Sequence, residues 1–137
     1  MVRLERGTCV AKERAPLAGR RCLVLDDEFL IALDIQQALE QAGAAEVVCA
    51  ANVESALMSV RGGGFDLAVL DLRLGRAGGN SLPVAAALEE TGTPFIFLTG
   101  MSGDAEHTRA YPEAPVVEKP YDGVALLGAV AKALDGG

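Results

Sequence analysis

The chain has 137 residues, of which 50% are hydrophobic and 23% are charged, and this size and hydrophobic content predict a single soluble domain with one core. Its formal net charge of −7, its aromatic content of 4% and its lack of Trp argue against a surface that binds nucleic acid. No apolar run reaches the roughly 18–20 residues of a membrane span, and the N-terminus lacks a secretory signal pattern, so we expect a cytoplasmic protein without membrane contact.

Residues 1–20 differ in composition from the rest of the chain. They contain Gly7, Pro16 and Gly19, several charged side chains and no sustained apolar period, so we expect a flexible basic N-terminal extension. Residues 1–21 carry six basic and two acidic side chains, a net charge of +4. Residues 22–137 carry six basic and 17 acidic side chains, a net charge of −11. The extension is therefore the part of the chain suited to an acidic partner.

From residue 21 onward, short apolar runs alternate with helical stripes, which predicts βα units around a buried parallel sheet. The first run spans 22–25, and the helix expected over 28–42 ends before the stop signal Gly43. Its apolar face holds Ile31, Ile35, Ala38, Leu39 and Ala42. The second run spans 47–51, and Asn52 is the expected N-cap of a helix that ends at Gly62.

The third run spans 67–70 and is followed by a helix that starts at Ser81, with Pro83 in its first turn. The fourth run spans 95–98. Residues 104–110 then hold no large apolar side chain, which predicts a short, weakly held and mobile helix. The fifth run spans 115–117, and the last helix covers 124–134 with Val124, Leu127, Ala131 and Leu134 on its buried face. All five strands are apolar on both faces, so we expect helices to cover both sides of the sheet.

The three cysteines, Cys9, Cys22 and Cys49, are an odd number without the spacing of a zinc site. Two of them lie inside apolar runs. Disulfide frameworks belong mainly to small secreted domains. We therefore expect reduced thiols, with Cys22 and Cys49 in the core.

Acidic and other polar residues follow the expected strands where each one ends. They are Asp26-Asp27-Glu28 after the first strand, Asp71 after the third, Thr99-Gly100 after the fourth and Glu118-Lys119-Pro120 after the fifth. In open parallel α/β sheets, functional groups gather at the carboxyl ends of the strands. Two unit charges about 4 Å apart repel by ~4 kcal/mol at an effective dielectric of 20. Clustered carboxylates therefore favour a hard divalent cation such as Mg²⁺.

A carboxylate beside Mg²⁺ can act as a nucleophile and form an acyl phosphate, with the metal offsetting charge in the transition state. The hydroxyl of Thr99 and the ammonium of Lys119 supply further contacts to phosphoryl oxygens. Taken alone, an acidic residue at a strand end is more often a turn former or a helix cap. Asp26 thus has an alternative role as a cap of the first helix, and Glu28 reads as a charge favoured by the helix dipole.

These motifs resemble those of receiver domains of bacterial two-component response regulators, and the likeness covers residues 21–134. It is carried by Asp26 and Asp27 in LVLDDE, Asp71 in LAVLDLRLG, Thr99 in FIFLTG and Lys119-Pro120 in VVEKP. The resemblance implies a doubly wound, flavodoxin-like parallel sheet of five strands in the order 2-1-3-4-5, with helices on both faces. It places a receiver domain at 21–135, without an output domain.

The resemblance also implies the roles of individual residues. Asp71 is the phosphoacceptor. Asp27, Asp71 and the backbone carbonyl of Arg73 ligate Mg²⁺, while Asp26 acts mainly through a bound water. Thr99 and Lys119 bind the phosphoryl group, and the peptide bond before Pro120 is a candidate for the cis form.

FIFLTGM is similar to the Phe-x-Phe-Ala-Thr-Gly-apolar pattern of the FATGUY subgroup, with Leu98 in place of Ala. That likeness implies a sensor histidine kinase of the HWE type as partner, directly or through a histidine phosphotransfer protein. Typical receivers carry Tyr or Phe three residues before the lysine, where this chain has Val116. We therefore expect switching to depend on reordering of residues 100–110. The family implies an unidentified downstream protein that binds the surface formed by 104–110, 115–117 and 124–134.

Two other functions compete with this interpretation. A Mg²⁺-dependent aspartyl phosphatase typically needs an acid two residues after its nucleophile, where this chain has Arg73. A pseudo-receiver that acts as an unphosphorylated adaptor is favoured by Val116 and opposed by the complete set of site residues. The lone His107 is expected to be solvated, and the glycines at 62–64 and 75–79 fit no phosphate-binding spacing, so both stretches are expected to be ordinary loops.

Overall fold

The computed structural model describes residues 16–74, 79–100, 108–119 and 122–136. These residues form five strands and four helices. Their order is β1 (Arg21–Leu25), α2 (Phe29–Gln41), β2 (Glu46–Ala50), α3 (Val53–Gly62), β3 (Leu67–Asp71), α4 (Leu82–Thr91), β4 (Phe95–Thr99), β5 (Val116–Glu118) and α6 (Gly123–Gly136). The expected strands and helices within this part are confirmed, with bounds that shift by one or two residues. The expected N-terminal extension up to residue 15, and residues 104–107 of the expected short helix, lie outside the described residues.

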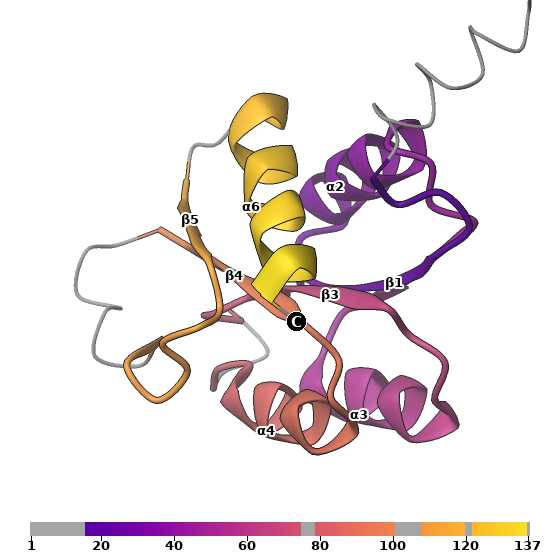
Figure 1. The fold of residues 1–137 in the computed structure, drawn as a ribbon. Coiled ribbons are helices and arrows are strands. Elements are labelled where there is room, and N and C mark those ends of the chain that lie inside the picture. Colours follow the sequence, from indigo (N-terminus) through magenta and orange to yellow (C-terminus); the bar gives the residue numbers. More distant parts are fainter. Residues whose placement is uncertain (1–15, 75–78, 101–107, 120–121, 137) are drawn as a thin grey trace, which may run out of the picture.

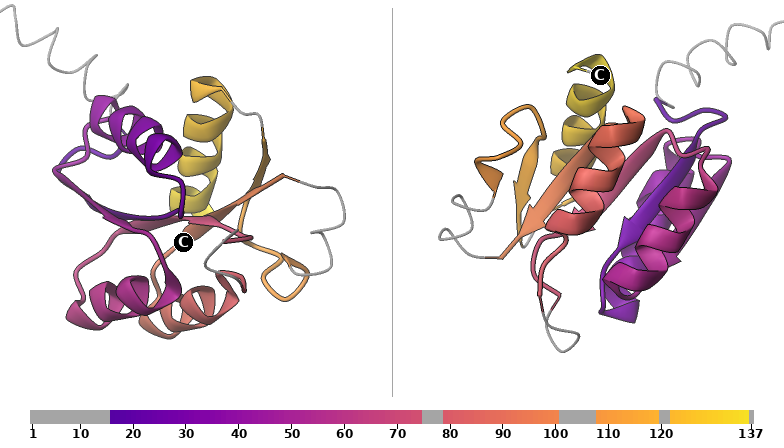
Figure 2. Two further views of the ribbon diagram at one scale, coloured as in Figure 1. Left: turned by 180° about the vertical axis from the view of Figure 1, so that it is seen from behind. Right: turned by 90° about the horizontal axis from the view of Figure 1, so that it is seen from below.

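The strands form one parallel sheet in the order β2-β1-β3-β4-β5, which confirms the predicted topology. Helices α2 and α6 cover one face, and α3 and α4 cover the other (Figure 1). In the right-hand view of Figure 2, α3 and α4 lie in front of the sheet and α6 lies behind it. The strand order reverses beside β1. In this class of fold, functional groups gather at the carboxyl edge of the sheet near such a reversal.

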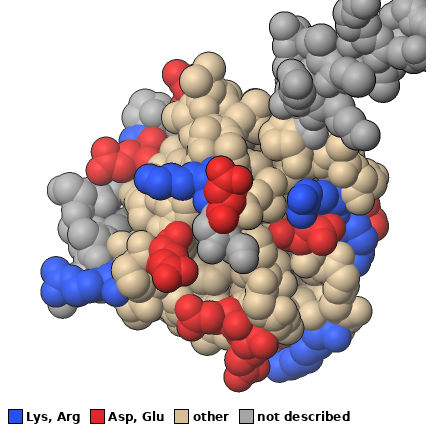
Figure 3. Space-filling view, viewed as in Figure 1, with Lys and Arg blue, Asp and Glu red and all other residues tan. Residues whose placement is uncertain are grey.

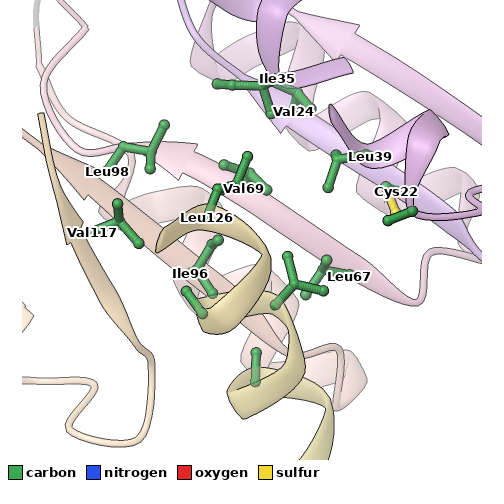
Figure 4. Packing of buried hydrophobic residues seen from close by; sticks show 14 of the residues in the cluster. Cys22, Val24, Ile35, Leu39, Leu67, Val69, Ile96, Leu98, Val117 and Leu126 are labelled. Carbon is green, nitrogen blue, oxygen red and sulfur yellow. The ribbon is translucent and has the colours of Figure 1, made fainter. Parts of the chain in front are cut away.

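The sheet separates two hydrophobic clusters. One contains inward-facing residues of α2 and α6 with alternate residues of the central strands, and Figure 4 shows Val24, Val69 and Ile96 of the sheet meeting Ile35, Leu39 and Leu126 of these helices. The other contains the remaining strand positions with residues of α3 and α4. Strands β1, β3 and β4 are buried apart from Arg21, as their apolar runs predict. The expectation of full cover is wrong for the edge strands β2 and β5, which are partly exposed because each has a neighbour on one side only.

Edge position also corrects the prediction for one cysteine. Cys22 is buried in β1 and its thiol is free, as expected. Cys49 is free but exposed, because it lies on the edge strand β2 and not in the core. Its Sγ lies 3.5 Å from Oε1 of Gln36, to which it donates a hydrogen bond. Cys9 lies outside the described residues.

The two helices on the lower face in Figure 1 begin with different capping arrangements. Asn52 is the N-cap of α3, as predicted, and its Oδ1 accepts a hydrogen bond of 2.8 Å from the amide of Ser55. Ser81 is the N-cap residue of α4, but its side chain makes no capping hydrogen bond. The amide of Leu82 is instead bonded at 3.0 Å to Oδ1 of Asn80. The side chain that satisfies the start of α4 thus belongs to Asn80, the residue before the N-cap.

Helix α6 is rotated relative to the expected buried face. Val124 is 83% exposed and Ala131 is exposed, whereas Leu127 and Leu134 are partly buried. The residues that face the sheet are Leu126, Ala129, Val130 and Ala133. Because α6 is apolar on nearly every side, its sequence period does not determine which side packs. Within the described residues, no helix combines the length and apolar character needed to cross a membrane.

Candidate functional site

The predicted site residues lie at one edge of the sheet. Asp71 and Thr99 are the last residues of the adjacent strands β3 and β4, and Lys119 directly follows β5. Asp26 directly follows β1, on the other side of β3. Because all strands run in parallel, their carboxyl ends meet at this edge. The strand order therefore explains why residues up to 93 positions apart in sequence form one site.

Three aspartates form an acidic cluster at this edge. One carboxylate oxygen from each of Asp26, Asp27 and Asp71 lies within 4.8 Å of the others. Asp26 is 2% exposed and Asp71 is 6% exposed, so two of the three carboxylates have little contact with water. A cluster of this kind, made of oxygen ligands and short of positive charge, fits a hard cation such as Mg²⁺.

The side chain of Asp26 shows how the backbone orients one member of this cluster. Its Oδ1 accepts a hydrogen bond of 2.9 Å from the amide of Glu28, two residues later. Glu28 occupies the N-cap position of α2, so Asp26 does not cap that helix in the usual way. Oδ2 of Asp26 is buried without a hydrogen-bond partner. A buried carboxylate oxygen without a donor is costly, and a bound cation would satisfy it.

Lys119 supplies positive charge to the cluster. Its Nζ lies 3.2 Å from Oδ2 of Asp71 and 3.9 Å from Oδ2 of Asp26. The backbone fixes this position, because the amide of Lys119 donates a hydrogen bond of 2.7 Å to the carbonyl of Thr99. The side chain of Lys119 is 22% exposed, so the ion pair is partly shielded from solvent. One ammonium cannot balance three neighbouring carboxylates.

The charge imbalance appears in the acidity of the two buried aspartates. The pKa of Asp71 is raised to about 6, mainly by burial and next by the neighbouring Asp26 carboxylate, while Lys119 opposes the rise. Burial also raises the pKa of Asp26, against the effects of the Glu28 amide and Lys119. Without a metal, protons therefore partly take the place of the missing positive charge. A divalent cation would favour the ionised form of both side chains.

The side chains of Thr99 and Asp71 belong to opposite faces of the sheet. Residues 95, 97 and 99 of β4 alternate onto the face covered by α3 and α4, whereas residues 67, 69 and 71 of β3 point to the face covered by α2 and α6. Asp71 lies opposite Leu98 in the strand register, and the amide of Leu72 donates a hydrogen bond of 2.9 Å to the carbonyl of Leu98. The buried Thr99 thus ends its strand beside Asp71, on the other face.

Arg73 lies two residues after Asp71, beyond the end of β3. Arg73 is exposed and pairs with Asn80 in an isolated antiparallel bridge. No second carboxylate stands two residues after Asp71, where the sequence places this arginine. The glycines at 62–64 precede β3 and therefore lie at the amino edge, away from the site. Their position agrees with the expectation of an ordinary loop.

Val116, at the position where an aromatic residue is typical, is 46% exposed on β5. Pro120 and His107 lie outside the described residues.

The hydrogen bond from the Glu28 amide to the Asp26 carboxylate was not predicted from the sequence, although an Asp just before a helix start is a common signal for such a turn.

In the view of Figure 3, acidic and basic side chains are interspersed, and the coloured residues form no continuous basic patch.

The arrangement is suited to nucleophilic chemistry at Asp71. Its carboxylate is buried, lies against an ammonium and shares an acidic cluster with Asp26 and Asp27. A nucleophilic carboxylate needs nearby positive charge to offset the charge of an incoming group. Lys119 and a cation held by the aspartates would supply that charge.

Comparisons with known proteins agree with this geometry. The sequence profile of the response regulator receiver domain matches residues 22–131. The transcriptional regulatory protein YvrH of Bacillus subtilis (strain 168) is 29% identical over 110 residues, which are 79% of this chain and 46% of YvrH, so the chain spans less than half the length of this curated relative.

Solved structures show the same architecture. SdrG from Sphingomonas melonis Fr1 is 36% identical and has a TM-score of 0.70, over 85% of this chain and 97% of SdrG. The response regulator TrrA from Thermotoga maritima, in complex with Mg²⁺ and BeF, is 29% identical and has a TM-score of 0.73, over 84% of this chain and 99% of TrrA. With a matching profile over most of its length and the predicted sheet order, the chain belongs to the family of response regulator receiver domains.

Proposed function

We propose that the chain accepts a phosphoryl group on Asp71 from a phosphohistidine of a sensor histidine kinase or a histidine phosphotransfer protein. The observation that carries the proposal is the contact of 3.2 Å between Lys119 Nζ and a buried Asp71 carboxylate that also belongs to the Asp26–Asp27 cluster. In the transfer, a carboxylate oxygen of Asp71 forms the new bond to phosphorus, and the bond from phosphorus to the histidine nitrogen breaks. The neutral or protonated histidine is the leaving group.

The residues around Asp71 have distinct roles in this proposal. Asp26, Asp27 and Asp71, together with the backbone carbonyl of Arg73, hold Mg²⁺, and Asp26 acts mainly through a water molecule. Bound Mg²⁺ supplies positive charge that offsets the charge of the transferring phosphoryl group. Lys119 binds a phosphoryl oxygen, and the Thr99 hydroxyl donates a hydrogen bond to another. TrrA, a relative of 29% identity solved with Mg²⁺ and BeF, supports a site of this kind.

The phosphorylated domain then transmits the signal by binding a downstream protein. We assign the receiver domain to residues 21–135 and place the chain in the cytoplasm. The downstream partner is proposed to bind the side formed by residues 104–110, β5 and α6. Membership of the FATGUY subgroup, and with it an HWE-type kinase, stays a prediction that depends on FIFLTGM. The same holds for a cis peptide bond before Pro120 and for reordering of residues 100–110, of which 101–107 lie outside the described residues.

A second candidate is an unphosphorylated adaptor of the same fold. Val116 favours it, because this exposed aliphatic residue offers no ring to couple the site to the surface. Phosphatase turnover is the weaker alternative, since the exposed Arg73 stands where such enzymes typically place an acid.

Intact-mass measurement separates these functions. The protein is incubated with acetyl phosphate and Mg²⁺, and we expect a gain of one phosphoryl group that EDTA and Asp71→Asn both abolish. Asp66→Asn is the matched control, because Asp66 accepts a hydrogen bond from the amide of Arg21 at the opposite edge of the sheet. The control should be phosphorylated like the wild type. No mass gain would favour the adaptor, and steady phosphate release from several esters would favour the phosphatase.

A further inference from the structure

Three aromatic rings meet on the face of the sheet covered by α3 and α4. The ring centroids of Phe95 and Phe97 are 5.5 Å apart at an interplanar angle of 79°. Tyr111 lies 5.5 Å from Phe95 at 74° and 6.1 Å from Phe97 at 53°. Edge-to-face pairs of this kind add stabilisation beyond that of the apolar area that they bury. The ring of Tyr111 therefore holds its own segment against two successive inward positions of β4.

Tyr111 belongs to a short segment, residues 108–114, that precedes β5. Turn hydrogen bonds of 2.9 Å and 3.0 Å connect the Tyr111 amide to Thr108 and the Ala114 amide to Tyr111. The side chains of Tyr111 and Ala114 pack on the cluster beneath the sheet, whereas 109, 110, 112 and 113 are exposed. The segment thus presents a polar outer surface and is attached to the core through few side chains, of which Tyr111 is the largest.

The aromatic cluster lies on the same face of β4 as Thr99. Phe95, Phe97 and Thr99 occupy alternate positions of the strand, so their side chains share one side. Thr99 is 3% exposed and ends the strand at the acidic cluster, and Phe97 is completely buried two residues before it. In a closely packed interior, displacement of one side chain is felt by its neighbours. Phe97 therefore lies between the site and the Tyr111 ring.

We propose that Tyr111 is a positioning residue that couples the phosphoryl site to residues 108–114 through Phe97. The inference rests on the proposed function. When the Thr99 hydroxyl moves to donate a hydrogen bond to a phosphoryl group on Asp71, the packing of Phe97 against Tyr111 changes. The exposed surface of residues 109–113 then shifts with the Tyr111 ring. Tyr111 thereby provides the aromatic contact that the exposed Val116 does not.

Tyrosine fluorescence tests the coupling directly. The chain has two Tyr and no Trp, so Tyr121→Phe leaves Tyr111 as the sole strong emitter. Beryllofluoride, a phosphoryl mimic, is titrated with Mg²⁺ while thermal stability is followed in parallel. We expect a saturable change in Tyr111 emission that Asp71→Asn abolishes. A rise in melting temperature with unchanged emission would overturn the coupling and leave the proposed function intact. If beryllofluoride leaves both unchanged and acetyl phosphate gives no mass gain, the proposed function fails, and the coupling with it.

Amide exchange of residues 108–114 distinguishes coupling from simple packing. In the wild type we expect exchange in this segment to differ between the free and the beryllofluoride-bound protein. The difference should persist in Tyr111→Phe, which keeps the ring, and be lost in Tyr111→Leu. Phe65→Leu is the matched control, because Phe65 packs on the same cluster but contacts Arg21 instead. If Tyr111→Leu keeps the difference, Tyr111 has a structural role only and the inference is wrong. The fluorescence measurement decides the question independently should Tyr111→Leu fold poorly.

Discussion

Lys119 Nζ lies 3.2 Å from Asp71 Oδ2, and this ion pair joins the shortest strand of the sheet to its centre. Lys119→Met removes the donor and leaves a buried carboxylate among others of the same charge. Hydrogen bonds to charged groups contribute about 1.5–3 kcal/mol, so in EDTA at pH 7 we expect the free energy of unfolding to fall by that amount. Urea denaturation measures it.

The fall in the free energy of unfolding caused by Lys119→Met should be smaller at pH 5, which is below the Asp71 pKa of about 6, because the protonated carboxyl needs no counter-ion. Lys132→Met is the control, since Lys132 is an exposed residue of α6. Equal losses at pH 5 and pH 7 for Lys119→Met would contradict the assignment of the ion pair.

The metal-free protein should lose stability as the pH rises from 5 to 7.5. The pKa of Asp71 is raised from 3.8 to about 6 in the folded state, so the folded protein holds a proton that the unfolded chain releases. This stabilising contribution is complete below pH 3.8 and is lost as the pH rises through about 6. Since one pKa unit corresponds to ~1.4 kcal/mol, the loss is on the order of 1–3 kcal/mol.

Melting temperatures in EDTA across this pH range check the prediction, with Asp71→Asn as the comparison. The variant should show a flatter profile, although Asp26, whose pKa is also raised, retains part of the slope. Mg²⁺ should raise the melting temperature of the wild type more at pH 7.5 than at pH 5, because metal and protons compete for the same oxygens. A Mg²⁺ effect that is absent at pH 7.5 would argue against a metal site.

The packing of α6 predicts opposite results for two aliphatic residues near its start. Leu126→Ala removes a completely buried side chain and should cost about 2–5 kcal/mol. Val124→Ala alters a side chain that is 83% exposed, so the free energy of unfolding should change by less than about 0.5 kcal/mol. Chemical denaturation of the two variants decides between this face and the one expected from the sequence period. A larger loss of unfolding free energy for Val124→Ala than for Leu126→Ala would instead support the buried face expected from the sequence period.

The start of α4 offers a test of where its cap lies. Asn80→Ala removes the acceptor for the Leu82 amide and should lower the free energy of unfolding by about 1 kcal/mol. Ser81→Ala removes a buried hydroxyl whose Oγ has no hydrogen-bond partner, and should raise the free energy of unfolding by about 1 kcal/mol. Thermal denaturation of both variants gives the comparison. Destabilisation by Ser81→Ala and none by Asn80→Ala would assign the cap to Ser81.

The strand positions were predictable because the central strands are apolar on both faces, which suits a buried parallel sheet. The sheet order was predicted from the resemblance to receiver domains and not from the apolar runs. A buried parallel sheet also located Asp26, Asp71, Thr99 and Lys119 at one edge, since parallel strands bring their carboxyl ends together. The contact between Lys119 and Asp71 follows from adjacency of β5, β4 and β3. It does not follow from any local pattern of either residue.

Features that depend on a side chain's surroundings were not predictable in this way. Cys49 lies in an apolar run like that of Cys22, but a position at the sheet edge leaves it exposed. The face of α6 was missed because Val124 and Leu126 are equally apolar, so tertiary packing alone selects between them. The contact of Tyr111 with Phe95 spans two elements and leaves no periodic signal in the sequence.

The short edge strand β5 has a consequence for how the molecule comes apart. It has three residues, pairs with β4 alone and buries one of its side chains, whereas the other strands of the sheet have five residues each. Regions with few buried contacts open locally at a lower free energy than the whole fold. Fraying of β5 would withdraw Lys119 from Asp71 while both hydrophobic clusters stay largely assembled. Local unfolding of this one edge strand can thus disrupt the site without global unfolding.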